Sequence, residues 1–428
     1  MPTRSQQGTL SVHRLTFCHL RYRIQESGCE TIAVTSVDAD TDDAAAVRAA
    51  GPATAPFGLY IHVPFCATRC GYCDFNTYTA GELGESSSPH AWAQALDGEL
   101  AAAAEVVGGV DVSTVFVGGG TPSLLGGEGL GGVLGTVRRH FRLADGAEVT
   151  TESNPESTSP EFFETLLAAG FTRISLGMQS AAPHVLRVLD RTHTPGRAVA
   201  AALEARAAGF AHVNLDLIYG TPGESDGDLR ASVDAVLAAG VDHVSAYALI
   251  VEDGTALARR IRRGEVPPVD DDVLADRYVL VDEALRDAGF DWYEVSNWAR
   301  GEDARCRHNE LYWDGADWWG AGPGAHSHLR GTRFWNIKHP ARYAAAVAAG
   351  ELPVAGHEVL GDADRHLEDV MLRVRMRSGL PAATLRPDEL ARAADEVASG
   401  NLVAGRDAYV LTDAGRLLAD GVVRRILA

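Results

Sequence analysis

Residues 66–73 read Cys-Ala-Thr-Arg-Cys-Gly-Tyr-Cys and closely follow the apolar run Leu59-Tyr-Ile-His-Val63. The run has the composition of a buried strand, and Pro64 helps to end it. A loop at the carboxyl end of a parallel strand faces the ligand side of a sheet. The cysteine loop is therefore predicted to lie at a binding site.

The thiolates of Cys66, Cys70 and Cys73 are the type of ligand that iron–sulfur clusters use. A [4Fe–4S] cluster bound by three cysteines keeps one iron without a protein ligand, and this iron can bind and activate a small molecule. A structural zinc site is the alternative, although zinc usually takes four ligands. The single CxxC pair has no second pair, so the cluster is favoured.

Around this loop, strand-like and helix-like segments alternate from Gly58 onward. Alternation of this kind indicates parallel strands joined by right-handed crossovers. The sequence predicts six such units, fewer than the eight of a closed TIM barrel. The expected strands are 59–63, 114–117, 148–152, 173–176, 212–218 and 243–249, and the expected helices are 89–107, 127–141, 159–169, 181–190, 195–209 and 226–239.

The chain is predicted to have four parts. Residues 1–56 are expected to be a disordered extension, in which Cys18 and Cys29 are incidental thiols. Residues 57–298 form the βα core, 299–356 an aromatic and Gly-rich segment, and 357–428 a helical, winged-helix-like domain. Acidic residues outnumber arginines in this last part, so we expect a packing domain and no DNA-binding surface.

The composition excludes several classes of function. The 428 residues carry 38 Lys+Arg and 58 Asp+Glu, a net charge of −20, which argues against nucleic acid as a partner. No apolar run approaches the roughly 18–20 residues of a transmembrane helix. The crowded cysteines suggest metal ligation in a reducing compartment, and a cytoplasmic protein is expected.

CxxxCxYC after a strand, on a βα-repeat chain, resembles the radical S-adenosylmethionine (SAM) superfamily. Residues 57–428 are more specifically similar to the oxygen-independent coproporphyrinogen-oxidase family, and within it to the HemW-type heme chaperones. The resemblance implies a partial (β/α)6 radical-SAM barrel. It is carried by Tyr60-Ile-His-Val-Pro-Phe-Cys, CGYCDFN, Val117-Gly-Gly-Gly-Thr-Pro-Ser, Glu152-Ser-Asn-Pro, Ser175-Leu-Gly-Met-Gln-Ser, Asp216-Leu-Ile-Tyr-Gly-Thr-Pro-Gly and the block from Cys306 to His326.

The resemblance also implies a SAM site. The amino and carboxylate groups of SAM would chelate the open iron, and its sulfonium would then be placed for reductive cleavage. Arg191 would pair with the methionyl carboxylate, and Asp216 would accept hydrogen bonds from ribose hydroxyls. The other implied contacts are Tyr60, Tyr72, Gly120, Thr121, Glu152, Gln179 and Ala246.

The segment His308-Asn-Glu-Leu-Tyr-Trp matches the HNxxYW motif of the chaperone branch, which implies that His308 contacts heme. Cys306 and His326 are weaker candidates for axial ligands. The alternative is that the aromatic residues cover the barrel mouth and that His308 bonds a backbone carbonyl.

The family's dehydrogenases carry a fourth cysteine two residues after the third, where this chain has Phe75. The resemblance thus favours a chaperone that binds heme, a [4Fe–4S] cluster and SAM and passes heme to an acceptor protein. An electron donor such as a flavodoxin or ferredoxin is compatible with it. An oxygen-independent coproporphyrinogen III dehydrogenase is the alternative, so whether the chain is an enzyme stays open.

Overall fold

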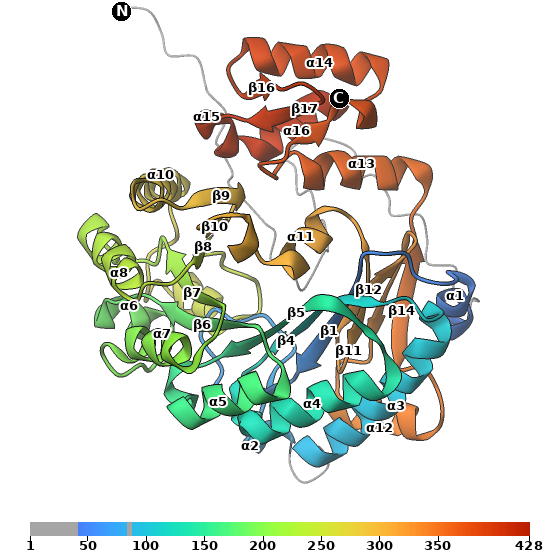
Figure 1. The fold of residues 1–428 in the computed structure, drawn as a ribbon. Helices are drawn as coiled ribbons and strands as arrows, with labels where there is room; N and C mark the ends of the chain where they lie inside the picture. The colour runs from blue at the N-terminus through green and yellow to red at the C-terminus, as the bar shows by residue number, and fades with distance from the viewer. Residues whose placement is uncertain (1–41, 84–87) are drawn as a thin grey trace, which may run out of the picture.

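The computed structural model describes residues 42–83 and 88–428, and a curved sheet of twelve strands lies at the centre of this part of the chain (Figure 1). Six strands run parallel and lie side by side in chain order, which confirms the predicted (β/α)6 partial barrel. These strands are β1 (Phe57–Val63), β4 (Val112–Gly119), β5 (Leu143–Ser153), β6 (Arg173–Gln179), β7 (His212–Tyr219) and β8 (His243–Ala248).

The sheet continues beyond both edges of the predicted six strands. One further strand joins β1 in parallel and is followed by three antiparallel strands, while two antiparallel strands follow β8. The additional strands are β11 (Asp317–Ala321), β12 (His326–Leu329), β13 (Thr332–Asn336), β14 (Val354–Val359), β10 (Asn297–Ala299) and β9 (Asp291–Glu294). The predicted boundary at 298/299 therefore falls inside β10, and the one at 356/357 falls inside β14. Both strands belong to this one sheet.

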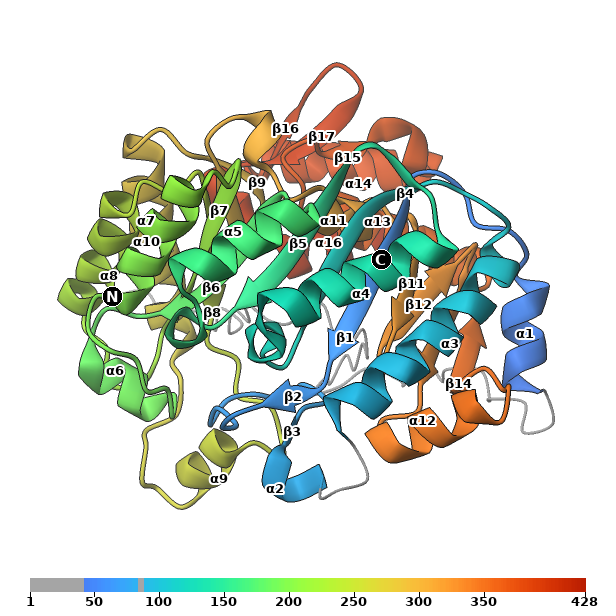
Figure 2. The ribbon, with the colours of Figure 1, turned by 60° about the horizontal axis from the view of Figure 1, so that its bottom comes forward.

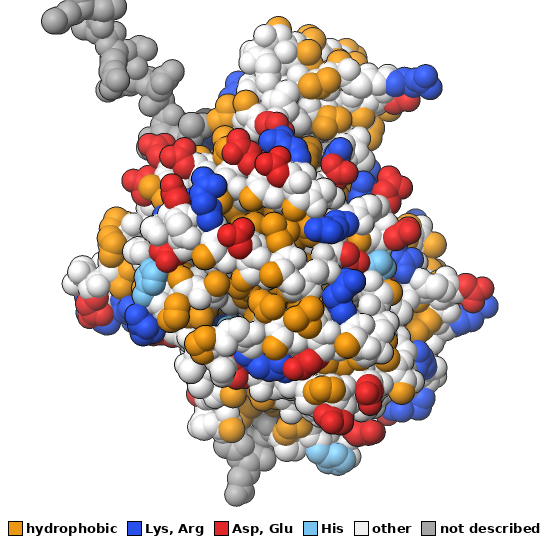
Figure 3. All heavy atoms as spheres, turned by 60° about the vertical axis from the view of Figure 1, so that its left-hand side comes forward, with side chains coloured by type: hydrophobic (Ala, Val, Ile, Leu, Met, Phe, Trp, Pro, Cys, Tyr) orange, Lys and Arg blue, Asp and Glu red, His pale blue; other side chains and the backbone are white. Residues whose placement is uncertain are grey.

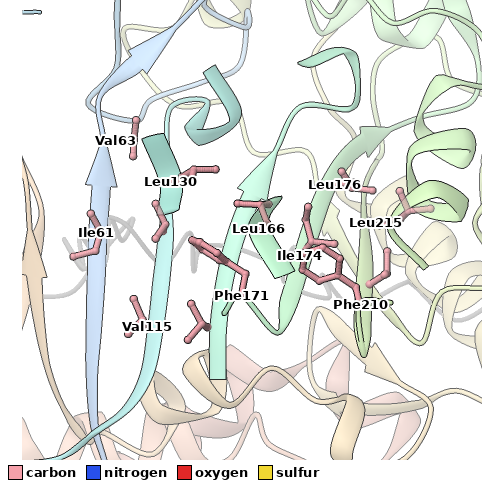
Figure 4. Packing of buried hydrophobic residues seen from close by; sticks show 14 of the residues in the cluster. Ile61, Val63, Val115, Leu130, Leu166, Phe171, Ile174, Leu176, Phe210 and Leu215 are labelled. Atoms are coloured by element: carbon pink, nitrogen blue, oxygen red, sulfur yellow. The ribbon is translucent and has the colours of Figure 1, made fainter. Parts of the chain in front are cut away.

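Helices cover the outer face of the sheet (Figure 1). Alternate side chains of the parallel strands point outward, where Val115 and Ile174 pack with Leu130, Leu166 and Phe171 in one apolar layer (Figure 4). Burying a side chain of this size stabilises the fold by roughly 1.5–3 kcal/mol. The helices of the barrel region are α3 (Pro89–Val107), α4 (Gly126–His140), α5 (Pro160–Ala169), α6 (Pro183–Val188), α7 (Arg197–Ala208), α8 (Asp226–Ala238), α9 (Ala256–Arg262), α10 (Asp271–Asp287) and α12 (Pro340–Ala348).

Two of these helices end at glycines whose backbone is left-handed. Gly170 caps α5 with φ 105° and Gly209 caps α7 with φ 114°, a region that residues with a side chain rarely enter. The chain can then turn back sharply to enter the next strand. This geometry explains the repeated Ala-Ala-Gly sequence at the ends of these helices.

The carboxyl-terminal unit has its own hydrophobic core and a three-stranded sheet, as a helical, winged-helix-like module predicts. It sits beside the short helix α11 (Arg307–Trp313), above the barrel in Figure 1. Its elements are α13 (Asp362–Arg373), β15 (Leu380–Pro381), α14 (Pro387–Ala398), β16 (Leu402–Ala404), β17 (Ala408–Leu411), α15 (Asp413–Arg416) and α16 (Ala419–Leu427).

The prediction of disorder over residues 1–56 is wrong for residues 42–56, and residues 1–41 lie outside the described part. Helix α1 (Asp43–Ala49) buries Val47 completely and contacts β14. The Thr54 backbone N–H and its hydroxyl both donate to Asp317 at 2.8 Å. The Ala- and Asp-rich composition suggested a solvated linker, whereas a distant strand supplies the apolar surface that orders it.

Within the described ranges, no helix has both the length and the apolar character that a membrane crossing requires. Acidic and basic side chains are interspersed on the face that Figure 3 shows, with apolar side chains between them. This face carries no continuous basic surface of the kind that binds nucleic acid.

Candidate functional site

A cavity of about 1820 Å³ occupies the interior of the partial barrel. This volume exceeds the roughly 300–1,000 Å³ of ordinary ligand pockets, so more than one ligand can fit. The predicted site residues that line it are Tyr60, Cys66, Cys70, Tyr72, Cys73, Gly120, Thr121, Glu152, Gln179, Arg191, Asp216 and His308. Ala246 does not line it: its side chain is fully buried, and its N–H donates to the Ser296 carbonyl at 2.9 Å.

The cysteine loop leaves β1 at the carboxyl end of the parallel strands, as predicted. Its two ends are joined where β2 (Phe65–Cys66) pairs with β3 (Tyr78–Thr79), close to α2 (Ala80–Leu83) (Figure 2). The imidazole Nε2 of His62 donates to the Asn76 carbonyl at 2.9 Å. The Asn76 side-chain amide in turn donates to the carbonyls of Pro323 and Lys338, at 2.9 and 2.8 Å.

The tip of the loop is fixed by backbone hydrogen bonds from two other elements. Gly71 N–H donates to the Leu189 carbonyl at 3.1 Å, and Leu257 N–H donates to the Gly71 carbonyl at 2.8 Å. A Cβ at Gly71 would lie 2.2 Å from an Asp190 carboxylate oxygen. A side chain between Cys70 and Tyr72 would therefore have to displace the Asp190 carboxylate.

The Gly-Gly-Gly-Thr sequence after β4 supports the base of the cysteine loop. Gly120 N–H donates to the Val63 carbonyl and Thr121 N–H to the Phe65 carbonyl, at 2.8 and 2.7 Å. A Cβ at Gly120 would lie 2.4 Å from the Phe65 carbonyl oxygen. The Thr121 hydroxyl donates to the Cys66 sulfur at 3.7 Å. This packing gives the glycine a structural role, and its predicted contact with SAM stays a prediction.

Arg191 places a cation beside the thiols. Its Nη1 lies 3.5 Å from the Cys70 sulfur, and its Nη2 donates to the Gly177 carbonyl at 3.2 Å. Its Nε is buried without a hydrogen-bond partner. Arg191 thus offers a positive charge and an unused hydrogen-bond donor at the cavity wall. Both properties fit an anionic iron–sulfur cluster, and they also fit the methionyl carboxylate of SAM, the partner that the family resemblance implies for Arg191.

Two carboxyl groups complete this end of the cavity. Glu152 accepts from Gly119 N–H at 3.0 Å, and burial, followed by repulsion from Asp216, raises the pKa of Glu152 to about 8. Asp216 accepts from Ser175 and Asn214, and burial raises its pKa. Gln179 adopts the left-handed backbone region with φ 67°, a strained conformation that concentrates at functional sites.

Cys66, Cys70 and Cys73 line the cavity at the end where their loop lies. In the described part of the chain, no three His, Cys, Asp or Glu side chains are grouped so that they could hold a single metal ion. Burial raises the pKa of Cys66 and raises that of Cys73 to about 11, so burial opposes in both residues the thiolate form that binds a metal. Three soft sulfur donors on one loop are the donor type that iron–sulfur clusters use.

The HNELYW segment forms α11 at the opposite, amino-terminal end of the strands. His308 is buried, with Nδ1 hydrogen-bonded to the Thr114 hydroxyl at 2.7 Å and Nε2 to the Tyr312 hydroxyl at 2.8 Å. Its ring stacks on Phe116 at 5.3 Å. Its partners are thus side-chain hydroxyls and not the backbone carbonyl of the alternative interpretation, and iron ligation would require one nitrogen to be released.

Sequence reasoning missed several residues that build the site. Asn76 fixes the cysteine loop, Glu148 accepts from the N–H groups of Arg307 and His308, and Asn214 bridges Asp216 to His243. Arg375 and Arg416 of the carboxyl-terminal unit also line the cavity. Asn76 lay within the quoted CGYCDFN motif, whereas the others are brought in by pairing between distant segments.

Burial of His308 predicts a pH dependence of stability. Burial lowers its pKa to about 3, so below its unfolded value of about 6.5 only the unfolded chain binds the proton. When the pH is lowered to 5, the free energy of unfolding of the native chain should therefore decrease by about 2 kcal/mol more than that of His308→Gln. Urea unfolding from pH 7.5 to 5 measures this difference, and parallel curves would contradict it.

The chain is similar to known radical SAM proteins in sequence and in fold. The model of the radical SAM superfamily matches residues 60–236, which include the cysteine loop and the strands up to β7. The solved structure of coproporphyrinogen III oxidase (HemN) from Escherichia coli, a radical SAM enzyme, aligns with a TM-score of 0.77 over 90% of this chain and 94% of that chain. Its sequence identity is 22%, so this likeness shows the fold alone.

The sequence relatives define the family more narrowly. The heme chaperone HemW of Mycobacterium tuberculosis (strain H37Rv) is 64% identical over 372 residues, which are 87% of this chain and 95% of the relative. HemW of Escherichia coli (strain K12) is 33% identical, over 87% of this chain and 98% of the relative. The chain belongs to the HemW family.

Proposed function

We propose that the protein is a heme chaperone that binds heme and a SAM-ligated [4Fe–4S] cluster and transfers heme to an acceptor protein. The observation that carries this proposal is the shared cavity, which joins the cysteine loop, Arg191 and the aromatic wall of the 306–335 region. The relatives that match nearly the whole chain are named heme chaperones.

Cys66, Cys70 and Cys73 would hold the cluster, which when bound supplies an open iron and one-electron chemistry toward SAM. Arg191 would pair with the SAM carboxylate, and Asp216, fixed by Ser175 and Asn214, would accept from the ribose. Burial keeps the Tyr72 pKa raised, so its hydroxyl stays neutral beside this charged site. A flavodoxin or ferredoxin would serve as electron donor. The protein would work in the cytoplasm, a proposal that the free cysteines of the loop support.

Titration with heme tests the proposal. We expect saturable binding near one heme per chain, seen as a shifted Soret band, in protein reconstituted with iron and sulfide without oxygen. A matched titration without SAM measures whether SAM changes the affinity. Heme that remains free at stoichiometric protein would overturn the proposal.

A second assay separates the chaperone from the dehydrogenase. Without oxygen, the reconstituted protein is incubated with coproporphyrinogen III, SAM and a reductant. We expect no protoporphyrinogen, because Phe75 and not cysteine follows the loop. Product formation above that of a chain lacking the loop cysteines would favour the enzyme.

A further inference from the structure

Arg173 places a guanidinium inside the barrel, at the start of β6. Its side chain is 1% exposed, and it points inward because alternate residues of β6, from Arg173 to Gln179, line the cavity. The residues between them, among them Ile174 and Leu176, pack on the opposite side of the sheet, under the helices (Figure 4). A charge this deep in a protein is costly unless it is paired and hydrogen-bonded.

The protein uses only part of this guanidinium. Its Nη1 donates to the Ala304 carbonyl at 2.8 Å and lies 3.4 Å from the Arg305 carbonyl oxygen. Its Nη2 is buried and has no hydrogen-bond partner among the described residues. The nearby Glu148 carboxylate does not fill this role, since its oxygens accept from the backbone N–H groups of Arg307 and His308. The guanidinium thus keeps one charged donor unused inside the barrel.

Thr150 is the direct neighbour of Arg173 across two parallel strands. The two residues are register partners on β5 and β6, so their side chains leave the sheet on the same side. Thr150 is also 1% exposed and lines the cavity, and its hydroxyl oxygen is buried without a hydrogen-bond partner in the described ranges. Two residues with unused donors therefore lie side by side at the cavity wall, although native proteins leave few such groups unpaired.

An aromatic surface adjoins this polar pair. Phe116 is the register partner of Thr150 on β4, and Tyr60 is the register partner of Phe116 on β1. The Tyr60 and Phe116 rings lie 6.3 Å apart at an angle of 28°, and both residues line the cavity. A buried cation and a hydroxyl beside flat apolar rings fit a carboxylate that is carried by a large, planar, hydrophobic ligand.

We propose that Arg173 and Thr150 bind a propionate carboxylate of heme, with Arg173 Nη2 and the Thr150 hydroxyl as donors. This inference rests on the proposed heme binding and assigns one edge of the porphyrin to the interior of the barrel. A carboxylate can accept both hydrogen bonds, so it satisfies the two groups and offsets the cost of burying them. Arg191 is left for the SAM carboxylate, because it lies at the other end of the cavity, beside Cys70.

Thr150→Val gives the cleaner test of this site, because the hydroxyl that it removes leaves no protein group unpaired. The free energy of unfolding of the ligand-free variant, measured with urea, should be unchanged or slightly higher. Its heme dissociation constant should rise by about tenfold, as expected for the loss of one hydrogen bond to a charged group. Thr151→Val is the matched control, since Thr151 faces the opposite side of the same strand and heme affinity should not change.

Esterified heme tests whether the carboxylate is the group that is recognised. Heme dimethyl ester has the same ring and iron as heme but lacks the two negative charges. The native chain should bind the ester more weakly than heme, by about tenfold or more, whereas Thr150→Val should bind the ester as well as the native chain does. Arg173→Lys keeps a cation and should lose less heme affinity than Arg173→Gln.

Three results would overturn the inference. The first is an equal loss of affinity for heme and for its ester in Thr150→Val, and the second is unchanged heme affinity in both Thr150→Val and Arg173→Gln. The third comes from equilibrium dialysis with labelled SAM: weaker SAM binding in Thr150→Val, with heme binding unchanged, would assign the carboxylate to SAM. Heme binding by the native chain leaves the chaperone proposal standing in all three cases. If the native chain binds no heme, the proposed function fails, and this inference fails with it.

Discussion

Cys70→Ser is expected to lower the iron content of anaerobically reconstituted protein from about four atoms per chain to nearly none. A serine hydroxyl is a poor replacement for a soft thiolate. Cys70 is also the thiol beside Arg191, so its loss removes the ligand nearest to the cation of the site. Iron and sulfide analysis, with the absorbance of the cluster, measures the effect.

Cys306→Ser is the matched control for this experiment. Its thiol lines the same cavity, but it lies next to Glu148 and Arg173 at the amino ends of the strands, away from the loop. It should therefore retain the iron of the native chain. If four irons remained after all three loop cysteines were replaced, the assignment of the cluster would be wrong.

Arg416→Ala is expected to destabilise the protein by about 3–5 kcal/mol, because it removes the buried cation that binds both oxygens of the buried Asp282 carboxylate. The Arg416 guanidinium is 1% exposed and makes hydrogen bonds of 2.8 and 2.7 Å to the two oxygens of Asp282. A further bond reaches the Tyr278 hydroxyl at 2.9 Å. Since Asp282 and Tyr278 are on α10, the interaction joins the carboxyl-terminal unit to the barrel.

Arg286→Ala controls for charge in the same cluster. Arg286 also pairs with Asp282, at 3.8 Å, but its side chain is 52% exposed, so its removal should cost about 0–1 kcal/mol. The urea midpoint of each variant gives the comparison. Equal losses in the two variants would show that burial does not govern this pair.

Local signals determined the barrel. Apolar runs separated by amphipathic segments placed the six parallel strands, and the glycines after α5 and α7 marked where these helices end. The spacing of Cys66, Cys70 and Cys73 identified the loop because the ligands are neighbours in the chain. The motifs that follow successive strands then met at one end of the sheet, since parallel strands present their carboxyl ends together.

Long-range pairing decided what the sequence could not. The block from 306 to 328 reads as one aromatic segment, yet it is divided: α11 fills the amino end of the barrel, while His326 returns to the carboxyl end. This division follows from the pairing of Asp317 with Phe57 and of His326 with Trp335, contacts that no local periodicity encodes. The folded structure of residues 42–56 likewise depends on contacts with distant segments, such as the hydrogen bonds from Thr54 to Asp317.

The chain by itself therefore determined the kind of chemistry, because donor type and spacing are properties of a short segment. Tertiary structure alone decided that His308 is enclosed by the hydroxyl groups of Thr114 and Tyr312. The reason is physical: hydrogen-bond partners and burial depend on residues brought together across more than two hundred positions, as for Asn76 and Pro323.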